Sequence, residues 1–229
     1  IKDMEGYRKN VARTLGLSML QNRLTELTQS SDAPFNAAFS GYGSIQARST
    51  DALQLGALIA PSGFEKGVKA LVTEQERAAR FGFTESELER TKKSRLASLE
   101  KGFKEKDKTE SANLIDSYVQ NYLTGSPVMG IGNVLKINQA LLPQISLEEV
   151  NNVFKSMLRN DNQVLVVMAS EKEGNVVPAE DALKAAISDA KAQELTAYED
   201  EVSDAPLVAE QPAPGRIMME SSWVEVEAT

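Results

Sequence analysis

The sequence predicts an α+β fold in which a mixed, largely antiparallel sheet packs against helices, one of them long and charged. Three observations support this prediction. Apolar residues recur at helical spacing through most of the 229 residues. Two short segments with strand-like patterns follow each other within residues 35–60. Residues 84–123 contain no proline and interleave charges of both signs, which is typical of a solvated helix.

The first expected elements are a helix and a β-hairpin. An apolar stripe at helical spacing runs through residues 4–27, and Gly16 marks either a kink or a change of buried face. Turn-forming residues then break the pattern before Pro34, which pushes the residue before it towards extended geometry. Phe35–Ile45 and Ala52–Ala60 follow as two strands. Because only a turn-like sequence separates them, the simplest prediction is an antiparallel hairpin.

Helices follow the hairpin, and specific residues mark their ends. Phe64–Phe81 has apolar residues on one face, and Gly82 is expected to end this helix. Thr84 and Glu87 form a capping box, in which a hydroxyl and a carboxylate satisfy the free amides at the start of the next helix. Gly102 is the only glycine in the charged stretch that follows. The pattern therefore predicts either one very long helix or two helices with a bend near Gly102.

The last part of the body is expected to combine helices with one strand. A helix is predicted at Asn133–Leu142. Ser146 and Glu149 form a second capping box that starts a further helix. The apolar segment Gln163–Ala169 predicts a buried strand, and Ala179–Lys191 predicts a short helix.

A change of composition divides the chain into two parts. Residues 1–195 are predicted to form one α/β domain, and residues 196–229 an acidic, proline-containing linker between domains. From Glu194 to the end there are nine acidic residues and one basic residue, Arg216, so this part carries the whole net charge of −8. The single tryptophan, Trp223, is expected to dock the linker onto a neighbouring domain.

Composition also excludes several functional classes. Residues 1–193 carry no net charge, so no basic excess exists to bind nucleic-acid phosphates. The longest apolar runs, such as Val164–Ala169, are too short to cross a bilayer. The absence of cysteine excludes disulfides and thiolate chemistry but leaves the compartment open. Because the chain starts with Ile1 and not with methionine, we expect it to be cut from a longer protein, and the lack of a leader says nothing about location.

The absence of both histidine and cysteine limits the metal chemistry of the chain. Zinc sites use nitrogen, sulfur and carboxylate ligands, so only a carboxylate site would remain, and such sites suit magnesium or calcium better. The clustered acids Glu85, Glu87 and Glu89 are interpreted as a solvated helix face rather than as ligands. We therefore expect no metal site in this chain.

Serine and glycine motifs give no stronger candidate. Without histidine, the remaining nucleophile would be a Ser-Lys pair, and Ser98 and Lys101 have that S-x-x-K spacing. Because Ser98 lies within a charged helix and no companion signature is present, it is interpreted as a surface serine. The segments "GYGS" (Gly41–Ser44) and "GIGN" (Gly130–Asn133) lack the rest of a phosphate loop, and Tyr42 is expected to pack on a strand rather than bind a ligand. No residue is therefore expected to be catalytic, cofactor-binding or metal-binding.

Several segments, taken in order, carry a family resemblance: "MLQNRLTEL", "DAPFNAAFSGYG", "FTESELERTKKSRLASLEK", "DSYVQNYLTGSPV", "LLPQISLEEVNNVFKSML" and "NQVLVVMASE". Together they resemble the insulinase/pitrilysin family of zinc peptidases, from Tyr7 to about Glu171. More specifically, they look like the second, non-catalytic domain of the N-terminal half in large bacterial members. The resemblance implies a processing-peptidase-like α/β domain whose first strand is missing here, and "PAPGRIMMESSWVEVEAT" resembles the linker to the next half.

The resemblance also implies where the catalytic residues of such a peptidase lie. Family members hold zinc and the general base in an inverted H-x-x-E-H motif of the first domain, with a distant glutamate as a further ligand. This sequence has none of these positions, so zinc is expected in the catalytic domain of a longer parent and not here. Some family domains also supply an arginine and a tyrosine after an "RL" turn. Here "NRL" (Asn22–Leu24) is followed by "TELTQSSDAPFNA", so that assisting role is not carried over.

The leading hypothesis is a non-catalytic domain of a zinc metalloendopeptidase. Such a domain would form part of the chamber wall and contact unfolded peptide through strand edges or helix faces. Its expected partners are the other domains of the same chain, unfolded peptides and, through exposed apolar surface, a second copy in a homodimer. The resemblance to large bacterial members points to the periplasm or the cell envelope.

Two alternatives stay open. A structural or scaffold protein derived from the same fold, like the core subunits of respiratory complexes that resemble these peptidases, would have no peptidase activity in the parent. A self-sufficient hydrolase would instead use Ser98 and Lys101. The sequence does not set the substrate, the compartment or the oligomeric state.

Overall fold

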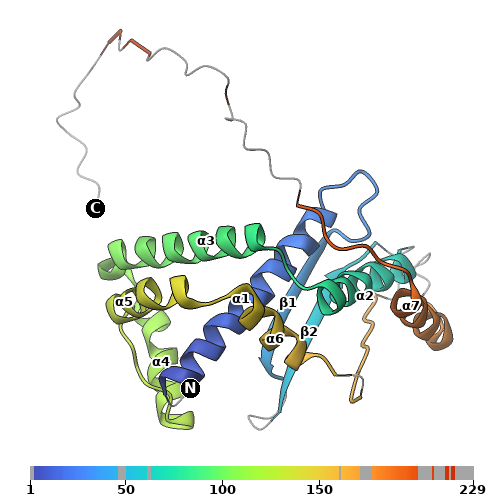
Figure 1. Ribbon diagram of the computed structural model, residues 1–229, viewed down its shortest axis with the longest axis horizontal. Coiled ribbons are helices and arrows are strands. Elements are labelled where there is room, and N and C mark those ends of the chain that lie inside the picture. The colour runs from blue at the N-terminus through green and yellow to red at the C-terminus, as the bar shows by residue number, and fades with distance from the viewer. Residues whose placement is uncertain are drawn as a thin grey trace.

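The computed structural model describes residues 3–45, 50–60, 63–159, 161–170 and 177–200, together with positions 208, 215, 216, 218 and 219. Within these ranges the chain has an α+β fold, as predicted, with helices around a two-stranded antiparallel sheet (Figure 1). The elements follow in the order α1 (Met4–Leu27), β1 (Ala37–Ser44), β2 (Asp51–Leu58), α2 (Phe64–Phe81), α3 (Glu85–Lys104), α4 (Ser111–Thr124), α5 (Ile131–Leu141), α6 (Leu147–Met157) and α7 (Glu180–Ala192). No helix in these ranges is both long enough and apolar enough to cross a bilayer.

Helix α1 is the centre of the fold. Asp3 Oδ1 accepts a hydrogen bond from the Gly6 amide at 2.7 Å and so caps the first turn. The helix is continuous through Gly16, which is buried where α1 crosses Val150 and Phe154 of α6. Because α1 also contacts β1, α2 and α3, most of the hydrophobic core is assembled around it.

Strands β1 and β2 form the predicted antiparallel hairpin. The register places Ala37 opposite Leu58 at one end and Phe39 opposite Gly56 further along. The ring of Phe39 lies across the position that a Cβ of Gly56 would occupy. An aromatic ring over a cross-strand glycine therefore helps to fix the register.

The boundary between α2 and α3 forms as the sequence predicts. Gly82 ends α2 with a φ of 76°, a conformation that favours glycine, and its amide donates to the Ala78 carbonyl at 3.0 Å. Thr84 then caps α3. Its hydroxyl accepts from the Glu87 amide at 3.2 Å, and the Glu87 carboxylate accepts from the Thr84 amide at 2.7 Å. The predicted capping box is thus confirmed.

The charged stretch forms two helices, so the second of the two predicted alternatives holds. Helix α3 ends at Lys104, a 3-10 turn follows at Lys106–Lys108, and α4 begins at Ser111. The break lies a few residues after Gly102, which is inside α3. Helix α4 stops at Gly125, whose φ of 69° lies in the left-handed region.

Three further helices complete the core. The hydroxyl of Ser146 accepts from the Glu149 amide at 3.2 Å and starts α6. The reciprocal half of the predicted capping box does not form, because the Glu149 carboxylate pairs with Arg8 of α1 at 2.6 Å. Phe154 of α6 packs edge-to-face on Phe83, with ring centroids 5.1 Å apart. Helix α7 covers the outer side of α2 (Figure 1).

The prediction of a buried strand at Gln163–Ala169 is wrong. This segment has no regular secondary structure, and Val164 and Met168 are 87% and 88% exposed. An apolar run becomes a strand only where a neighbouring strand pairs with its backbone groups. Within the described ranges only β1 and β2 pair, so the sheet there is a hairpin and not the mixed sheet that the sequence pattern suggested.

Candidate functional site

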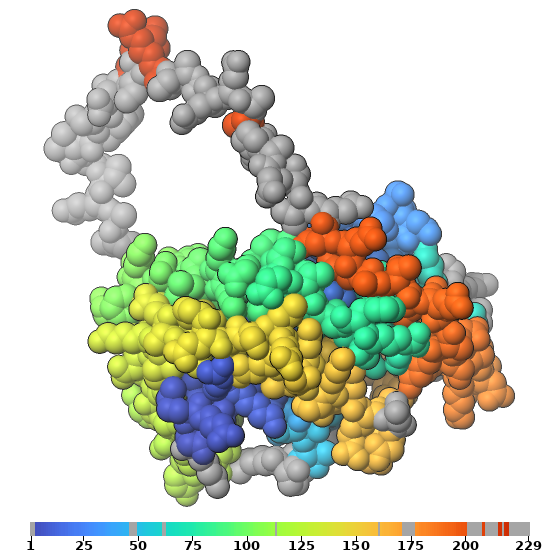
Figure 2. Space-filling view, viewed as in Figure 1, coloured from blue at the N-terminus to red at the C-terminus, as the bar shows by residue number. Residues whose placement is uncertain are grey.

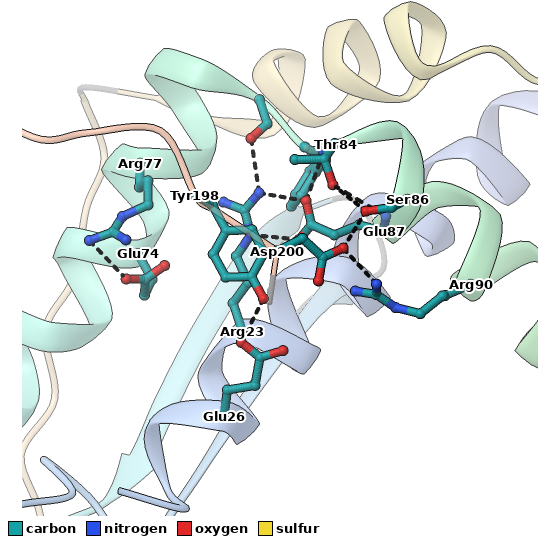
Figure 3. A network of polar contacts seen from close by, with 12 residues as sticks. Arg23, Glu26, Glu74, Arg77, Thr84, Ser86, Glu87, Arg90, Tyr198 and Asp200 are labelled. Atoms are coloured by element: carbon teal, nitrogen blue, oxygen red, sulfur yellow. Dashed lines mark hydrogen bonds and ion pairs between the residues drawn. The ribbon is translucent and has the colours of Figure 1, made fainter. Parts of the chain in front are cut away.

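A buried ion pair joins α1 to α3 (Figure 3). Arg23 Nε donates to Glu87 Oε1 at 2.7 Å, and Arg23 Nη2 donates to Glu87 Oε2 at 2.8 Å. Nη2 also donates to the Gly82 carbonyl at 3.1 Å. The two side chains are only 1% and 4% exposed, so the pair is shielded from water and its two parallel bonds fix the helices to each other.

Two aromatic rings enclose the Arg23 guanidinium. It lies 4.9 Å from the ring centroid of Phe83 and 4.2 Å from that of Tyr198. Figure 3 shows Tyr198 lying across Arg23, and its hydroxyl donates to Glu26 Oε2 at 2.7 Å. Burial, together with the hydrogen bond to Glu26, raises the pKa of Tyr198 well above its ordinary value, so the hydroxyl stays a donor.

Tyr198 belongs to an extended segment, Gln193–Asp200, which is named the strap here. Figure 2 shows the strap as an orange-red band on the surface over α2 and the beginning of α3. Arg80 of α2 holds the junction between α7 and the strap by donating to the carbonyls of Lys191 in α7 and of Gln193 in the strap, the latter at 2.9 Å. Arg80 thus binds main-chain carbonyls, and these contacts do not depend on the side chains of the strap.

Asp200 holds the end of the strap against α3. Its carboxylate accepts from Arg90 at 2.6 Å and also from the hydroxyl of Ser86. The hydrogen bond from Arg90, with a further one from Ser86, keeps the pKa of Asp200 below its ordinary value. In turn, the bond to Asp200 raises the pKa of Arg90. This face of the protein thus binds an extended segment with an acidic end, in this case its own.

Glu74 of α2 is a buried carboxylate close to the same network (Figure 3). Its side chain is 7% exposed, and Arg77 Nη2 lies 3.5 Å from its Oε1. Its Oε2 has no hydrogen-bond partner in the described part of the chain. Burial raises the pKa of Glu74 above its ordinary value, and the charges of Arg77 and Arg23 offset this only in part.

A groove of 740 Å³ lies between α1 and α3, beside the network. Its lining contains hydroxyl and amide side chains, two arginines and no acidic residue: Thr14, Leu15, Leu17, Ser18, Gln21, Asn22, Ser40, Arg90, Thr91, Ser94, Arg95, Ser98 and Leu99. Three of these residues are leucines, and Arg90 is already paired with Asp200, so Arg95 is the charged side chain of the lining that is left to meet an acidic or polar chain segment.

Several groove side chains are available to a ligand. Within the described residues, Ser18, Ser94 and Ser98 make no side-chain hydrogen bond. A hydroxyl can both donate and accept, so these groups can bond the amides and carbonyls of an extended peptide. Arg95 uses its Nε to donate to Asn138 Oδ1 at 2.8 Å, which orients its guanidinium at the groove.

The structure also shows where several weaker sequence candidates lie. Ser98 and Lys101 are both exposed on α3, and among the described residues no hydrogen bond joins them. Tyr42 packs against the core, with the Arg13 guanidinium 4.3 Å from its ring centroid. Trp223 lies outside the described residues.

The prediction of a solvated face at Glu85, Glu87 and Glu89 is wrong for Glu87. The outer two are exposed, but Glu87 is turned towards α1 by the capping geometry and pairs there with Arg23. One signal in the sequence could have indicated this pair. Arg23 lies three residues after Leu20 on the apolar face of its helix, and a buried cation requires a partner of opposite charge.

Zinc does not fit the residues of this chain. The sequence supplies no imidazole and no thiolate ligand. In the part of the chain that the structure describes, no three Asp or Glu side chains gather into a group that could hold a metal ion.

The chain matches no protein-family model. It is 23% identical, over all 229 residues, to a zinc protease PQQL-like from Arabidopsis thaliana. Its fold matches the first half of the periplasmic protease PqqL from Escherichia coli with a TM-score of 0.67 and 14% identity, over 87% of this chain and 43% of that one. A predicted insulinase family protease from Yersinia pestis gives a TM-score of 0.64 and 16% identity, over 82% and 39%. The fold is that of an insulinase-family protease domain.

Similarity along the whole chain shows homology to the PQQL-like protease and confirms the resemblance read from the sequence motifs. The chain spans 21% of the length of that Arabidopsis protein, and 23% of the complete PqqL, which it matches with a TM-score of 0.68. It therefore corresponds to one part of each of these longer proteases.

Proposed function

We propose that the chain is a non-catalytic domain of a zinc metalloendopeptidase, where it forms part of the chamber wall and contacts unfolded peptide. One combination of observations carries the proposal: homology to a zinc protease along the whole chain, in a sequence without histidine or cysteine. A protease domain without nitrogen or sulfur ligands has a supporting role rather than a zinc-binding one. The other domains of the same protease are then its permanent partners, and they hold the zinc.

The groove between α1 and α3 is the surface that we assign to peptide contact. Its free hydroxyls are able to bond the backbone of any unfolded sequence, as a protease wall requires. The strap supports this assignment, because an extended acidic segment already pairs with Arg90, which lines the groove. A bound peptide would continue this mode of contact along α3, past Ser94 and Ser98.

We also infer a location in the periplasm or the cell envelope. The support is the description of PqqL from Escherichia coli as a periplasmic protease. A chain without cysteine is compatible with an oxidising compartment. Fractionation of cells followed by immunodetection tests this inference, and recovery in the cytosolic fraction alone would contradict it.

Fluorescence anisotropy with a labelled, unfolded, acidic peptide tests the peptide contact. The key variant is Ser94→Phe, which fills the groove from a position whose side chain makes no hydrogen bond among the described residues. The matched control is Ala97→Phe, which adds the same ring on the exposed part of α3 outside the groove lining. We expect a saturable rise with the unmodified chain, an affinity about tenfold weaker with Ser94→Phe, and no change with Ala97→Phe.

Two results would count against the proposal. A flat titration into the high micromolar range would leave the domain a purely structural role. Equal weakening by both phenylalanine variants would show that binding takes place elsewhere on the surface. A basic peptide of the same length serves as the specificity control, and it is expected to bind less tightly because Arg95 leaves the groove with a positive charge and no acidic residue lines it.

A further inference from the structure

The apolar face of α4 has no role in the contacts described so far. Every described side chain of α4 is exposed, including six large apolar ones: Leu114, Ile115, Tyr118, Val119, Tyr122 and Leu123. Their spacing places them on one face of the helix. Tyr122 is the most exposed of them, at 88%. A contiguous apolar face of this kind marks an interaction surface.

Helix α4 needs such an interaction in order to be stable. It has 14 residues, and its N-cap residue Glu110 makes no side-chain capping bond. Helices of this length are marginal in water by themselves, and most of their stability in proteins comes from burial of an apolar face. The far end is well formed, since Gly125 adopts the left-handed conformation and Asn121 donates to the Ser126 carbonyl at 2.7 Å. The C-terminal end of α4 is thus well capped, whereas its apolar face is exposed to solvent.

We infer that the apolar face of α4 is the docking surface for a companion domain of the same protease chain. The inference rests on the proposed function. The composition of the face supports it, because two tyrosines and four aliphatic residues without a charge are typical of a permanent interface core. The one charged residue of α4 is Asp116, which falls outside this apolar set.

The relatives supply the reason to choose a companion domain as the occupant. The chain covers 43% of the first half of PqqL, so the larger part of that half is protein outside the match. A substrate peptide is a poorer occupant, because it leaves after each turnover and would expose the apolar face again. A permanently docked domain removes this surface from water and supplies the burial that α4 needs.

Hydrogen exchange on the protein expressed from its full reading frame tests the inference. We expect the amides of residues 111–124 to be protected, and Tyr122→Asp to speed their exchange by at least about tenfold. The control is Gln120→Asp, which places the same charge on the polar face of the same helix and is expected to leave protection unchanged. Fast exchange of α4 in the unmodified protein would overturn the inference.

Two accompanying measurements separate the other occupants. Light scattering over a dilution series gives the mass, and protection that disappears as the protein becomes monomeric would show that a second copy covers α4. Protection that appears only after an unfolded peptide is added would show that substrate does so, and either result overturns the inference. The Tyr122→Asp variant is expected to bind peptide in the groove as the unmodified protein does. Normal peptide anisotropy with this variant therefore shows that it is folded and that its groove is intact. If the unmodified protein does not bind peptide in the groove but its α4 amides are still protected, the result counts against the proposed function and not against the docking surface.

Discussion

Arg23 of α1 and Glu87 of α3 are 64 residues apart in the chain and form a buried pair with hydrogen bonds of 2.7 and 2.8 Å. Because Glu87 also caps α3, one carboxylate sets both the start of that helix and its contact with α1. The same two helices form the walls of the groove. The pair therefore positions the surface that we assign to peptide contact.

Glu87→Gln is expected to destabilise the protein strongly. The substitution leaves the Arg23 guanidinium buried without a counter-charge, and breaking a buried pair in this way costs about 3–5 kcal/mol. Urea unfolding followed by circular dichroism measures the loss. Glu89→Gln, on the exposed part of the same helix, is the control and is expected to stay within about 0.5 kcal/mol of wild type. Similar stability of the two variants would contradict the role given to the pair.

Tyr198→Ala is expected to release the strap. It removes the ring that lies 4.2 Å from the Arg23 guanidinium and the hydrogen bond to Glu26, interactions that together contribute about 1–2 kcal/mol. A protease should then cleave the strap of Tyr198→Ala several-fold faster than that of the wild type. The cleavage rate of Tyr198→Phe should lie between these two. The control is Glu199→Gln, at an exposed position of the strap, and it should be cleaved at the wild-type rate. An unchanged cleavage rate in Tyr198→Ala would mean that other contacts hold the strap.

Glu74 is expected to make stability depend on pH. Because burial raises its pKa in the folded state above the unfolded value, the folded protein binds the proton more tightly. This contribution is present below the ordinary, unfolded pKa of a glutamate and is lost as the pH rises through the raised folded pKa. Glu74→Gln should therefore be more stable than wild type above that folded pKa, and the difference should shrink on acidification.

Unfolding free energies of both proteins over a pH series check this prediction. Glu65→Gln, at an exposed position in the first turn of α2, is the control and should differ from wild type by less than about 0.5 kcal/mol at every pH. A Glu74→Gln variant that is less stable at high pH would show that the contact with Arg77 outweighs the effect of burial.

Gly82 and Gly125 are expected to differ in their response to alanine. Both have positive φ, at 76° and 69°. Gly125, with ψ at 14°, lies in the left-handed region, where alanine costs about 1–2 kcal/mol, whereas Gly82, with ψ at −161°, lies in a region that is essentially restricted to glycine. A Cβ at Gly82 would also lie 2.7 Å from Asn151 Nδ2, whereas a Cβ at Gly125 would meet nothing within 4 Å. Asn151 is itself held by the bond from the Phe83 amide at 2.9 Å. Thermal unfolding should therefore show a larger loss for Gly82→Ala, and equal losses would contradict this steric explanation.

The parts of the fold that depend on neighbouring residues were predictable. Gly82 ends α2 and the Thr84–Glu87 box starts α3, because these signals act within one helical turn. The hairpin follows from two strand-like segments joined by a short turn. Homology was also readable, since the quoted motifs extend over most of the body.

The parts that depend on distant residues were not predictable. A strand at Gln163–Ala169 needs a neighbouring strand, and no local pattern shows whether one is there. The pairing of Arg23 with Glu87 depends on how α1 and α3 cross. The strap extends past residue 195, the predicted end of the body, because contacts of Tyr198 and Asp200 with α1 and α3 outweigh its linker-like composition.

The most direct test of the proposed function is zinc-dependent cleavage of an unfolded polypeptide by the protein expressed from its full reading frame. We expect cleavage that stops on chelation and returns with zinc. We also expect a higher KM with little change in kcat for Ser94→Phe, and wild-type values for Ala97→Phe. A protein that is folded and zinc-loaded but cleaves nothing would contradict the proposal and favour the scaffold alternative.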